Sequence, residues 1–515
     1  MAALRASSQN NVEIIGGEKL SFDKPKSQWT IVKNVVIKHD GVFIQCDSAI
    51  RKMSEGMIEG FGHIYIYQPD TFTLSGGEYL KYDEKTKTAI VTGKNVVLND
   101  KEMTLLTTSL QYNTQNQMGY YTNGADILSD SNTLRSQKGY YDRRANVFHF
   151  KDRVKITGKD FTMEGDTLDY YAGNKTAYFF GPTRITSQEN VIVCNYGWYN
   201  TAEEYAQFSR GATIFSDSTT LNADSLQYDK KKGLGRGMGN IRMYDSGEHI
   251  AVYGQYGLYR QKSKETTVSG EPVAIKADKD DTMYLLADTF YYVGDSLHRL
   301  LKAYHHASIM QKEFQAKCDS LLYNFKDSFI ALFKSPIMWN QKNQVTGDTM
   351  FINLQNHKIK SMNVREGAFL ASEVRPRYYN QISGKYMNNM FDSNKLKTVL
   401  VEGNARSIYY LRDNETDSAE YTGVNNVACT KMLISLDSSK VRGIRFYGQP
   451  EGKIYPVNQF PDAEKFLDGL DWKLEQKPVL ESFIERTKRK ERILVPQAPE
   501  AAPAKSKKKK RKTKV

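Results

Sequence analysis

Ala223-Asp224-Ser225-Leu226-Gln227-Tyr228 is the clearest copy of a phrase that returns along most of the chain. Close copies are Gly165-Asp166-Thr167-Leu168-Asp169-Tyr170 and Cys318-Asp319-Ser320-Leu321-Leu322-Tyr323. Counted from the aspartate or its equivalent, the copies stand at positions 47, 78, 108, 138, 166, 196, 224, 255, 288, 319 and 348, which are 28 to 33 residues apart. Eleven copies at one spacing indicate a repeat architecture.

A second phrase falls about midway between these copies, as in Gly62-His63-Ile64-Tyr65-Ile66 and Gly239-Asn240-Ile241-Arg242-Met243. Apolar and polar residues alternate after the glycine, and similar stretches follow Gly93, Gly270 and Gly403. This period of two predicts half-buried strands. Each unit is therefore predicted to be a strand, a turn rich in Asn, Asp and Gly, and a second strand, with the mid-strand glycines marking bends.

One such unit cannot enclose a core, but stacked units bury a continuous apolar interior. We therefore predict an all-β fold, a solenoid of stacked antiparallel strands built from about eleven repeats of about 30 residues, in which each bent strand contributes to two facing sheets. At about two rungs per repeat and roughly 4.8 Å per rung, the rod would be on the order of 100 Å long. Its ends would be open sheet edges, which must be capped or must pair with another sheet.

The sequence divides into five predicted segments. Residues 1–11 are interpreted as a leader remnant, 12–260 as a first module of repeats, 261–456 as a second module, 457–495 as a C-terminal extension able to form a short helix, and 496–515 as a disordered lysine-rich tail. No stretch approaches the length of an apolar membrane-spanning helix, and residues 1–8 lack the apolar core of a secretory signal. We expect either a cytoplasmic protein or a chain whose export signal has been removed.

The formal charge of +13 is concentrated at the C-terminus. The 515 residues include 72 basic and 59 acidic side chains, and thirteen of the basic ones but only two acidic ones lie from Arg486 onward. The repeats are therefore nearly neutral, which argues against nucleic acid as a partner. The tail is expected either to contact anionic lipid surfaces or to be solvated without a function, and its basic run consists of Lys507, Lys508, Lys509, Lys510, Arg511 and Lys512.

No catalytic or metal-binding motif stands out. The alternating glycines of residues 233–239 precede no helix, so they predict no phosphate site. His305 and His306 are neighbours in a strand and point to opposite faces, which disfavours joint metal binding. The repeat aspartates could form a calcium row, but Asp before Ser or Thr more often bonds nearby backbone groups. We predict no catalytic residue, no metal and no cofactor.

The four cysteines lie more than a hundred residues apart, at Cys46, Cys194, Cys318 and Cys429. This spacing fits neither a zinc site nor a disulfide framework, although it leaves one long-range bridge open. We predict that they are buried small hydrophobic residues.

The apolar residues of the repeats have two interpretations. They can form a closed core, which patterning alone favours, or the two sheets can diverge at one edge and leave a groove that holds acyl chains. The candidate groove residues are Ile64, Ile66, Val96, Leu98, Val154, Ile156, Leu168, Tyr170, Ile185, Leu226, Ile241, Met243, Val273 and Ile275.

The ordered phrases, an Asp-Ser/Thr-Leu-x-Tyr strand, an Asn/Gly turn and a Gly-Asn-Ile/Val strand, resemble the OstA/LptA family of lipopolysaccharide-transport proteins over about residues 12–455. The ending Ile444-Arg445-Phe446-Tyr447-Gly448-Gln449-Pro450-Glu451-Gly452-Lys453-Ile454-Tyr455-Pro456 is similar to that of long OstA-like proteins of Bacteroidetes-type bacteria. The resemblance implies a twisted, V-shaped β-jellyroll whose interior holds the acyl chains of lipid A. With it, the groove becomes the favoured interpretation. The number of repeats and the basic tail depart from the family pattern.

The resemblance also implies partners and a place in the cell. The implied ligand is lipopolysaccharide, and the implied partners are an inner-membrane LptC-like protein, an outer-membrane LptD-like barrel and further copies joined edge to edge. Together they would form a periplasmic bridge that extends to the outer membrane. Two alternatives stay open: a structural β-solenoid scaffold of the envelope without lipid cargo, and a carbohydrate-active β-helix enzyme, for which no pair of acidic residues stands out.

Overall fold

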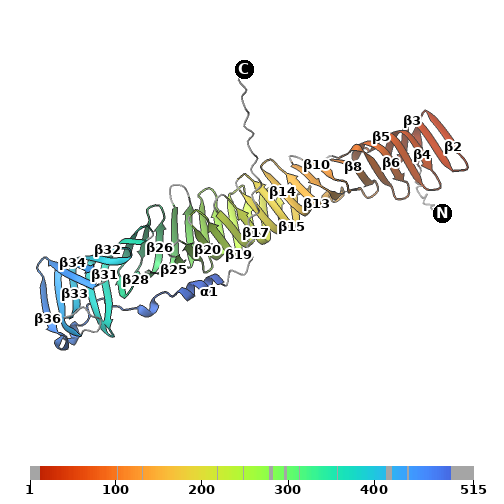
Figure 1. Ribbon diagram of the computed structural model, residues 1–515. Coiled ribbons are helices and arrows are strands. Elements are labelled where there is room, and N and C mark those ends of the chain that lie inside the picture. The colour runs from red at the N-terminus through yellow and green to blue at the C-terminus, as the bar shows by residue number, and fades with distance from the viewer. Residues whose placement is uncertain are drawn as a thin grey trace, which may run out of the picture.

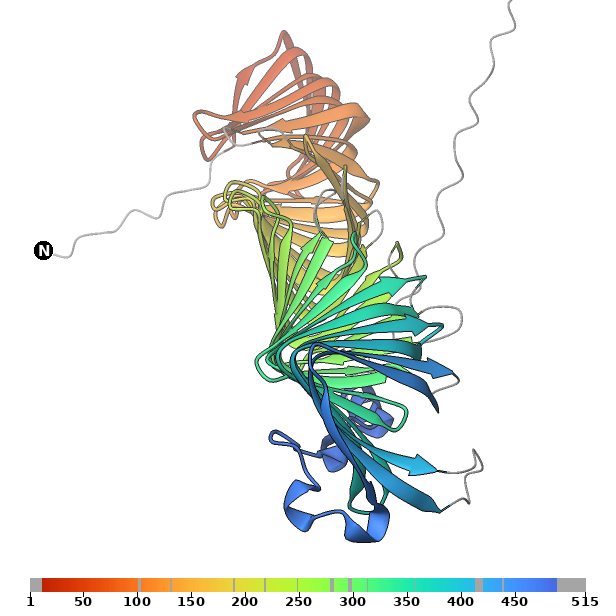
Figure 2. The same ribbon diagram turned by 90° about the vertical axis from the view of Figure 1, so that its left-hand side faces the viewer.

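The structure, a computed structural model, is a long twisted rod of β-strands (Figure 1). It describes residues 12–488 apart from 101–102, 130–131, 189, 217–218, 248, 278–281, 295–298, 313, 357, 413–419 and 438–439. The predicted leader remnant at 1–11 and the predicted disordered tail at 496–515, with its basic run, lie outside the described residues. Successive strands turn relative to one another along the rod, as antiparallel strands do (Figure 2).

The first part of the rod contains these strands: β1 (Glu13–Gly16), β2 (Lys19–Asp23), β3 (Gln28–His39), β4 (Val42–Lys52), β5 (Met57–Gln68), β6 (Phe72–Asp83), β7 (Thr88–Asn99), β8 (Thr104–Asn113), β9 (Met118–Tyr121), β10 (Ala125–Ser129), β11 (Asn132–Ser136), β12 (Lys138–Asp142), β13 (Val147–Thr157), β14 (Phe161–Tyr171), β15 (Thr176–Ser187), β16 (Val191–Asn200), β17 (Tyr205–Phe215), β18 (Thr219–Asp229) and β19 (Leu234–Asp245).

The second part continues with these strands: β20 (Ile250–Arg260), β21 (Glu265–Ser269), β22 (Val273–Ala277), β23 (Thr282–Leu286), β24 (Thr289–Gly294), β25 (Arg299–Met310), β26 (Phe314–Asn324), β27 (Phe329–Phe333), β28 (Ile337–Asn340), β29 (Asn343–Thr346), β30 (Thr349–Gln355), β31 (Lys358–Arg375), β32 (Tyr378–Asp392), β33 (Lys395–Arg412), β34 (Tyr421–Asp437), β35 (Lys440–Tyr447) and β36 (Glu451–Pro456). Three short 3-10 helices and one α-helix follow: η1 (Val457–Gln459), η2 (Asp462–Glu464), η3 (Leu474–Gln476) and α1 (Leu480–Lys488). The predicted all-β stack of antiparallel strands is thus confirmed.

Each long strand bends near its middle and continues in a second sheet. In β19 the bend lies at Gly239 and Asn240, which both have positive φ, 74° and 45°. Residues 234–238 pair with residues 225–229 of β18, and after a register shift residues 242–245 pair with 219–222. We call the layer formed by the former halves sheet 1 and the layer formed by the latter halves sheet 2. The long side of the rod opposite the bends, where the free ends of the two sheets face each other, is called the mouth.

The two sequence phrases meet at these bends. Asn240 donates a hydrogen bond from Nδ2 to Asp224 Oδ2 at 2.7 Å, and His63 Nδ1 lies 2.8 Å from Asp47 Oδ2. At this corner a side chain before the bending residue would be crowded, because a Cβ at Gly239 would lie 2.4 Å from Asp224 Oδ2. The aspartate of the first phrase and the Gly-Asn or Gly-His of the second therefore form one structural device, a pinned corner.

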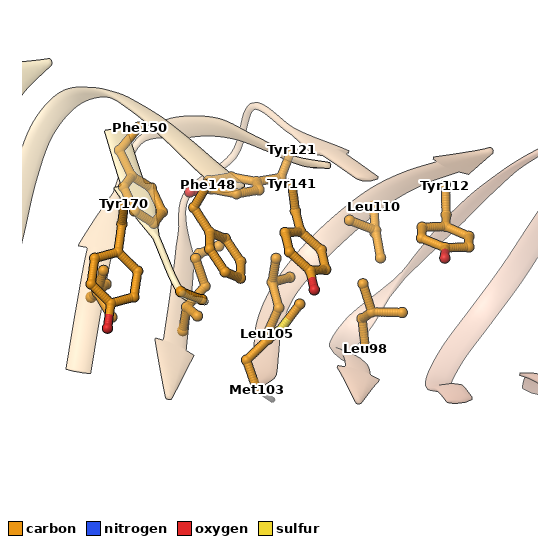
Figure 3. Packing of buried hydrophobic residues seen from close by; sticks show 14 of the residues in the cluster. Leu98, Met103, Leu105, Leu110, Tyr112, Tyr121, Tyr141, Phe148, Phe150 and Tyr170 are labelled. Atoms are coloured by element: carbon orange, nitrogen blue, oxygen red, sulfur yellow. The ribbon is translucent and has the colours of Figure 1, made fainter. Parts of the chain in front are cut away.

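The hydrophobic core lies between the sheets and consists of two main clusters. The first extends from Ile31 to Ile241 and the second from Ile250 to Ile434. Figure 3 shows part of the first cluster, in which Leu98, Leu110, Tyr141 and other buried side chains follow one another along the rod. The stacked strands thus bury a continuous row of apolar side chains, as solenoids do.

The C-terminal extension returns along the outer face of sheet 2. Phe460 and Leu467 pack there against Phe369 and its neighbours, whereas the alternate residue Leu370 belongs to the interior cluster. Helix α1 follows and lies beside the middle of the rod (Figure 1). Within the described ranges, no helix has the length and apolar character needed to cross a membrane.

Candidate lipid-binding interior

Most predicted groove residues lie between the two sheets. Eleven of them are at most 9% exposed and belong to the first core cluster, and Met243 is half-buried against the second cluster. The eleven are Ile64, Ile66, Val96, Leu98, Val154, Ile156, Leu168, Tyr170, Ile185, Leu226 and Ile241. The alternation of the sequence therefore identified the interior face over most of the chain.

Val273 and Ile275 are a correction, because they point away from this interior. Ala274 packs in the second core cluster, whereas Val273 packs with Leu286 and with Phe483 of α1 in a separate cluster that Ile275 adjoins. Successive strand residues face opposite sides, so an error of one residue exchanges inside for outside. The offset from the bend carried the signal: the interior residue Ile241 lies two positions after Gly239, whereas Val273 lies three positions after Gly270.

A row of tyrosines closes the mouth along the first part of the rod. The last residue of the repeated phrase lies at the free end of sheet 1, and Tyr82, Tyr112, Tyr141 and Tyr170 are at most 3% exposed. Burial raises the pKa of Tyr82 to about 12. The prediction included only Tyr170 from this row, although the tyrosine recurs in the phrase and so offered a signal.

These tyrosines contact sheet 2 across the mouth. Tyr82 Oη lies 2.8 Å from His39 Nδ1, and the Tyr112 and Phe72 ring centroids are 4.5 Å apart. Tyr141 donates a hydrogen bond from Oη to Asp100 Oδ2 at 2.8 Å. Apolar faces and hydroxyl groups together make a seam that is tight but polar at its outer rim.

Ion pairs lie just outside the tyrosines. They connect Lys87 Nζ to Asp40 Oδ2 at 2.5 Å, Arg143 Nε to Asp100 Oδ2 at 3.6 Å and Lys230 Nζ to Asp160 Oδ2 at 3.9 Å. In each pair the basic residue belongs to the sheet 1 end and the acid to the sheet 2 end. The Lys230–Asp160 pair is about half exposed, and an exposed pair contributes only about 0–1 kcal/mol, whereas Asp100 is buried. The ion pair across the mouth is therefore weaker at Lys230 and Asp160 than at the buried Asp100.

The closure is weakest at the middle of the rod. Tyr199 and Tyr228 are only half-buried, and Tyr259 is 37% exposed. The inner face of sheet 1 carries Gly235, Gly237 and Gly257 here, where other repeats have Leu, Tyr or Phe. The two core clusters are also separate at this point.

A narrow apolar cavity of about 20 Å³ adjoins this place, with room for about one water molecule. Its walls come from both sheets, and the lining residues are Met243, Asp245, Ile250, Val252, Thr266, Val268, Phe290, Tyr292, Leu301 and Phe325. A longer apolar ligand can enter only if these side chains rotate or the sheets separate.

The described residues show no constellation for metal binding. Across this part of the chain, no group of three or more His, Cys, Asp or Glu side chains is arranged to hold a metal ion. His305 and His306 both lie at a bend and contact different aspartates, Asp319 at 3.2 Å and Asp288 at 2.9 Å. The repeat aspartates thus contact side chains at the corners, whereas their interpretation as turn and ladder residues predicted bonds to nearby backbone groups.

Acidification is expected to loosen the first part of the mouth. Burial lowers the pKa of His39 below its ordinary value of 6.5, so the folded protein binds this proton less readily than the unfolded chain. The stabilisation from neutral His39 is therefore complete above about pH 6.5 and is lost as the pH falls through the lowered pKa of the folded state. Amide hydrogen exchange around His39 and Tyr82, corrected for intrinsic rates, should be faster at about pH 5 than at about pH 7.5. The variant His39→Gln should show no such change; an equal change in that variant would assign the effect to other groups.

The fold and interior define the class of protein: a β-jellyroll solenoid with an apolar interior between two sheets. Residues 10–166 and 162–224 match the model of the OstA-like protein family. These residues cover less than half of the chain, and over them the resemblance to the OstA-like family inferred from the repeats is confirmed.

No match to a curated protein was found. Among solved structures, the chain is similar to LptH of Pseudomonas aeruginosa, described as the LptA homologous periplasmic component of the conserved lipopolysaccharide transport device. The sequence identity is 14%, the match covers 28% of this chain and 80% of LptH, and the TM-score is 0.15. At this TM-score the match carries no structural argument.

Proposed function

We propose that the protein is a non-enzymatic carrier of lipopolysaccharide that holds acyl chains between its two sheets. The supporting observation is the apolar interior, which runs along the described part of the rod and lies behind a mouth with a polar rim. An amphiphile fits this geometry, because its acyl chains gain about 0.8 kcal/mol per CH₂ buried, while its charged sugar headgroup stays in water. The match of residues 10–166 and 162–224 to the OstA-like family supports the same proposal.

Loading requires the mouth to open, since the cavity of about 20 Å³ is far smaller than an acyl chain. The middle of the rod is the best entry point, because the tyrosine row is most exposed there and glycines replace large side chains. The headgroup would remain outside, so movement along the rod would open the mouth contacts in succession. The energy for such movement would come from a partner.

The proposed setting is the periplasm, where the rod would form part of a bridge that carries lipopolysaccharide to the outer membrane. The match of residues 10–166 and 162–224 to the OstA-like family supports this setting. The proposed partners are an LptC-like protein at the inner membrane, an LptD-like protein at the outer membrane and further copies joined at the rod ends. The open edge at β2 carries exposed Leu20 and Phe22, which suits addition of another strand.

Photo-crosslinking tests the lipid site directly. With a photoreactive residue at Met243 or Leu301, both of which line the cavity, we expect crosslinks to added lipopolysaccharide. The matched control is Arg242, the neighbour of Met243, whose side chain points to the outer face. No crosslink at 243 or 301, or equal crosslinking at 242, would contradict the proposal.

A structural scaffold without lipid cargo is the second candidate. It is favoured by the tight burial of the first cluster, where Tyr82, Tyr112, Tyr141 and Tyr170 are at most 3% exposed. Native mass spectrometry of the purified protein separates the two candidates, because a scaffold with a closed core retains no lipid.

A further inference from the structure

The outer face of sheet 1 carries a row of aromatic side chains that takes no part in the interior. Tyr120 of β9 lies opposite Tyr140 of β12, and Tyr140 lies opposite His149 of β13. The residue opposite His149 on the next strand is Asp169 of β14, which is not aromatic. The row then continues with Tyr178 of β15 and Trp198 of β16. Neighbouring strands are about 4.8 Å apart, so the row offers one side chain per rung along the rod.

The rings of this row are held in place but remain accessible. Tyr140 and His149 stack at 4.2 Å between centroids, and His149 Nδ1 lies 2.6 Å from Asp169 Oδ1. Trp198 contacts the ring of Tyr205 at 5.5 Å. Tyr120 is 40% exposed, and the other rings of the row are half-buried. A fixed, partly exposed aromatic surface costs little conformational entropy when it binds a ligand.

A hollow of about 420 Å³ lies at the free end of sheet 1 beside Trp198. Its rim carries two acids and two bases, which pair as Asp229 with Lys232 at 2.9 Å and Glu203 with Lys231 at 3.6 Å. The full lining is Trp198, Asn200, Glu203, Tyr205, Asp229, Lys231 and Lys232. The rim is thus neutral in sum and offers both hydrogen-bond donors and acceptors.

We propose that this aromatic row and the hollow at Trp198 bind a glycan chain that lies along the rod. A pyranose ring has an apolar C–H face, which suits an aromatic ring, and a rim of hydroxyl groups, which suits paired carboxylates, amines and amides. The rung spacing is close to the length of one pyranose residue. A balanced rim favours a hydroxyl-rich ligand over a polyanion such as nucleic acid, which needs excess positive charge.

The glycan has two possible sources that share this chemistry: the uncharged outer sugars of lipopolysaccharide, or an amino-sugar polymer of the cell wall. The inference rests on the outer face of sheet 1 and is independent of the proposed lipid site, which lies on the inner face. A failure of lipid crosslinking at 243 and 301 would therefore leave it standing.

Titration of the whole protein with two probes tests the proposal. The probes are a β-1,4-linked hexamer of N-acetylglucosamine and the fully deacylated oligosaccharide of lipopolysaccharide, and binding is measured by calorimetry. Binding of either probe supports the proposal, and the probe that binds identifies the source. Trp198→Ala should weaken binding by about tenfold, the effect of one good ring contact. Trp198→Phe, which keeps a flat ring, should weaken it less.

The matched control is Tyr256→Ala, which removes a ring that is 61% exposed on the same outer face but outside the row. It should leave the affinity unchanged. Thermal unfolding checks that each variant is folded; should Trp198→Ala fail to fold, Tyr140→Ala replaces it. The proposal is overturned if neither probe binds the parent protein, or if folded Trp198→Ala or its replacement binds as tightly as the parent.

Discussion

A covalent link across the mouth between positions 160 and 230 is expected to reduce uptake of lipopolysaccharide by at least about tenfold, because a linked mouth cannot shift to the open state that lipid entry requires. Asp160 and Lys230 form an ion pair across the mouth at 3.9 Å, and both side chains are about half exposed. Cysteines at both positions, joined by a short reducible bis-maleimide, would replace a weak contact with a permanent one. Because the link between acyl chains and headgroup must pass through the mouth, a closed mouth excludes the lipid.

The native thiols should not interfere with this experiment. Cys46 and Cys194 are buried, and burial raises their pKa to about 11 and about 12. Cys318 is half-buried, and its pKa is also raised to about 12. Since the thiolate is the reactive form, the engineered cysteines should react selectively at neutral pH.

Two controls complete the closure experiment. Reduction of the crosslinker should restore uptake, and each single-cysteine variant treated with the reagent should take up lipid as the parent does. Uptake is measured with labelled lipopolysaccharide and native mass spectrometry. Equal uptake by the closed and the reduced protein would show that lipid does not enter through this mouth.

Replacement of Gln381 by leucine is expected to detach the C-terminal extension from sheet 2 and to lower the free energy of unfolding by about 2–6 kcal/mol. Two buried backbone groups of the extension lose their hydrogen-bond partner in this variant. The Gln381 side chain is fully buried. Its Nε2 donates to the carbonyl of Lys465 at 2.8 Å, and its Oε1 accepts from the amide of Leu467 at 2.8 Å. The Gln381 side chain thus donates one hydrogen bond to the backbone of the extension and accepts one from it, as a neighbouring strand would, and holds the extension on sheet 2.

Hydrogen exchange measures this release at the Leu467 amide, which should lose most of its protection in Gln381→Leu. Gln344 makes the same double contact with Asp471 and Lys473, so the variant with both glutamines replaced should release the extension further. The control is Gln355→Leu, an exposed glutamine of β30, which should change stability by less than about 0.5 kcal/mol. Full protection at Leu467 in Gln381→Leu would show that apolar contacts alone hold the extension.

Much of the candidate interior could be predicted because its signal is local. In Gly239-Asn240-Ile241 the glycine, the bending residue and the first interior residue are consecutive, and the same order recurs in Gly62-His63-Ile64. The prediction was wrong at Val273 and Ile275, because these apolar residues lie at an odd number of positions after Gly270 and therefore face outward. These two residues are apolar for another reason, since they face the outer surface that Phe483 covers.

The sequence by itself determined the period, the strands, the bends and most of the interior face, because each depends on residues that are neighbours along one strand. Only the tertiary structure decided what closes the rod. His39 and Tyr82 are 43 residues apart, and Gln381 and Lys465 are 84 apart, so their contacts follow from the stacking of strands and the return of the chain. The same holds for the aromatic row, whose members come from five different strands. The sequence of one repeat determines which side chains face inward, whereas the register between repeats determines which of these side chains contact one another.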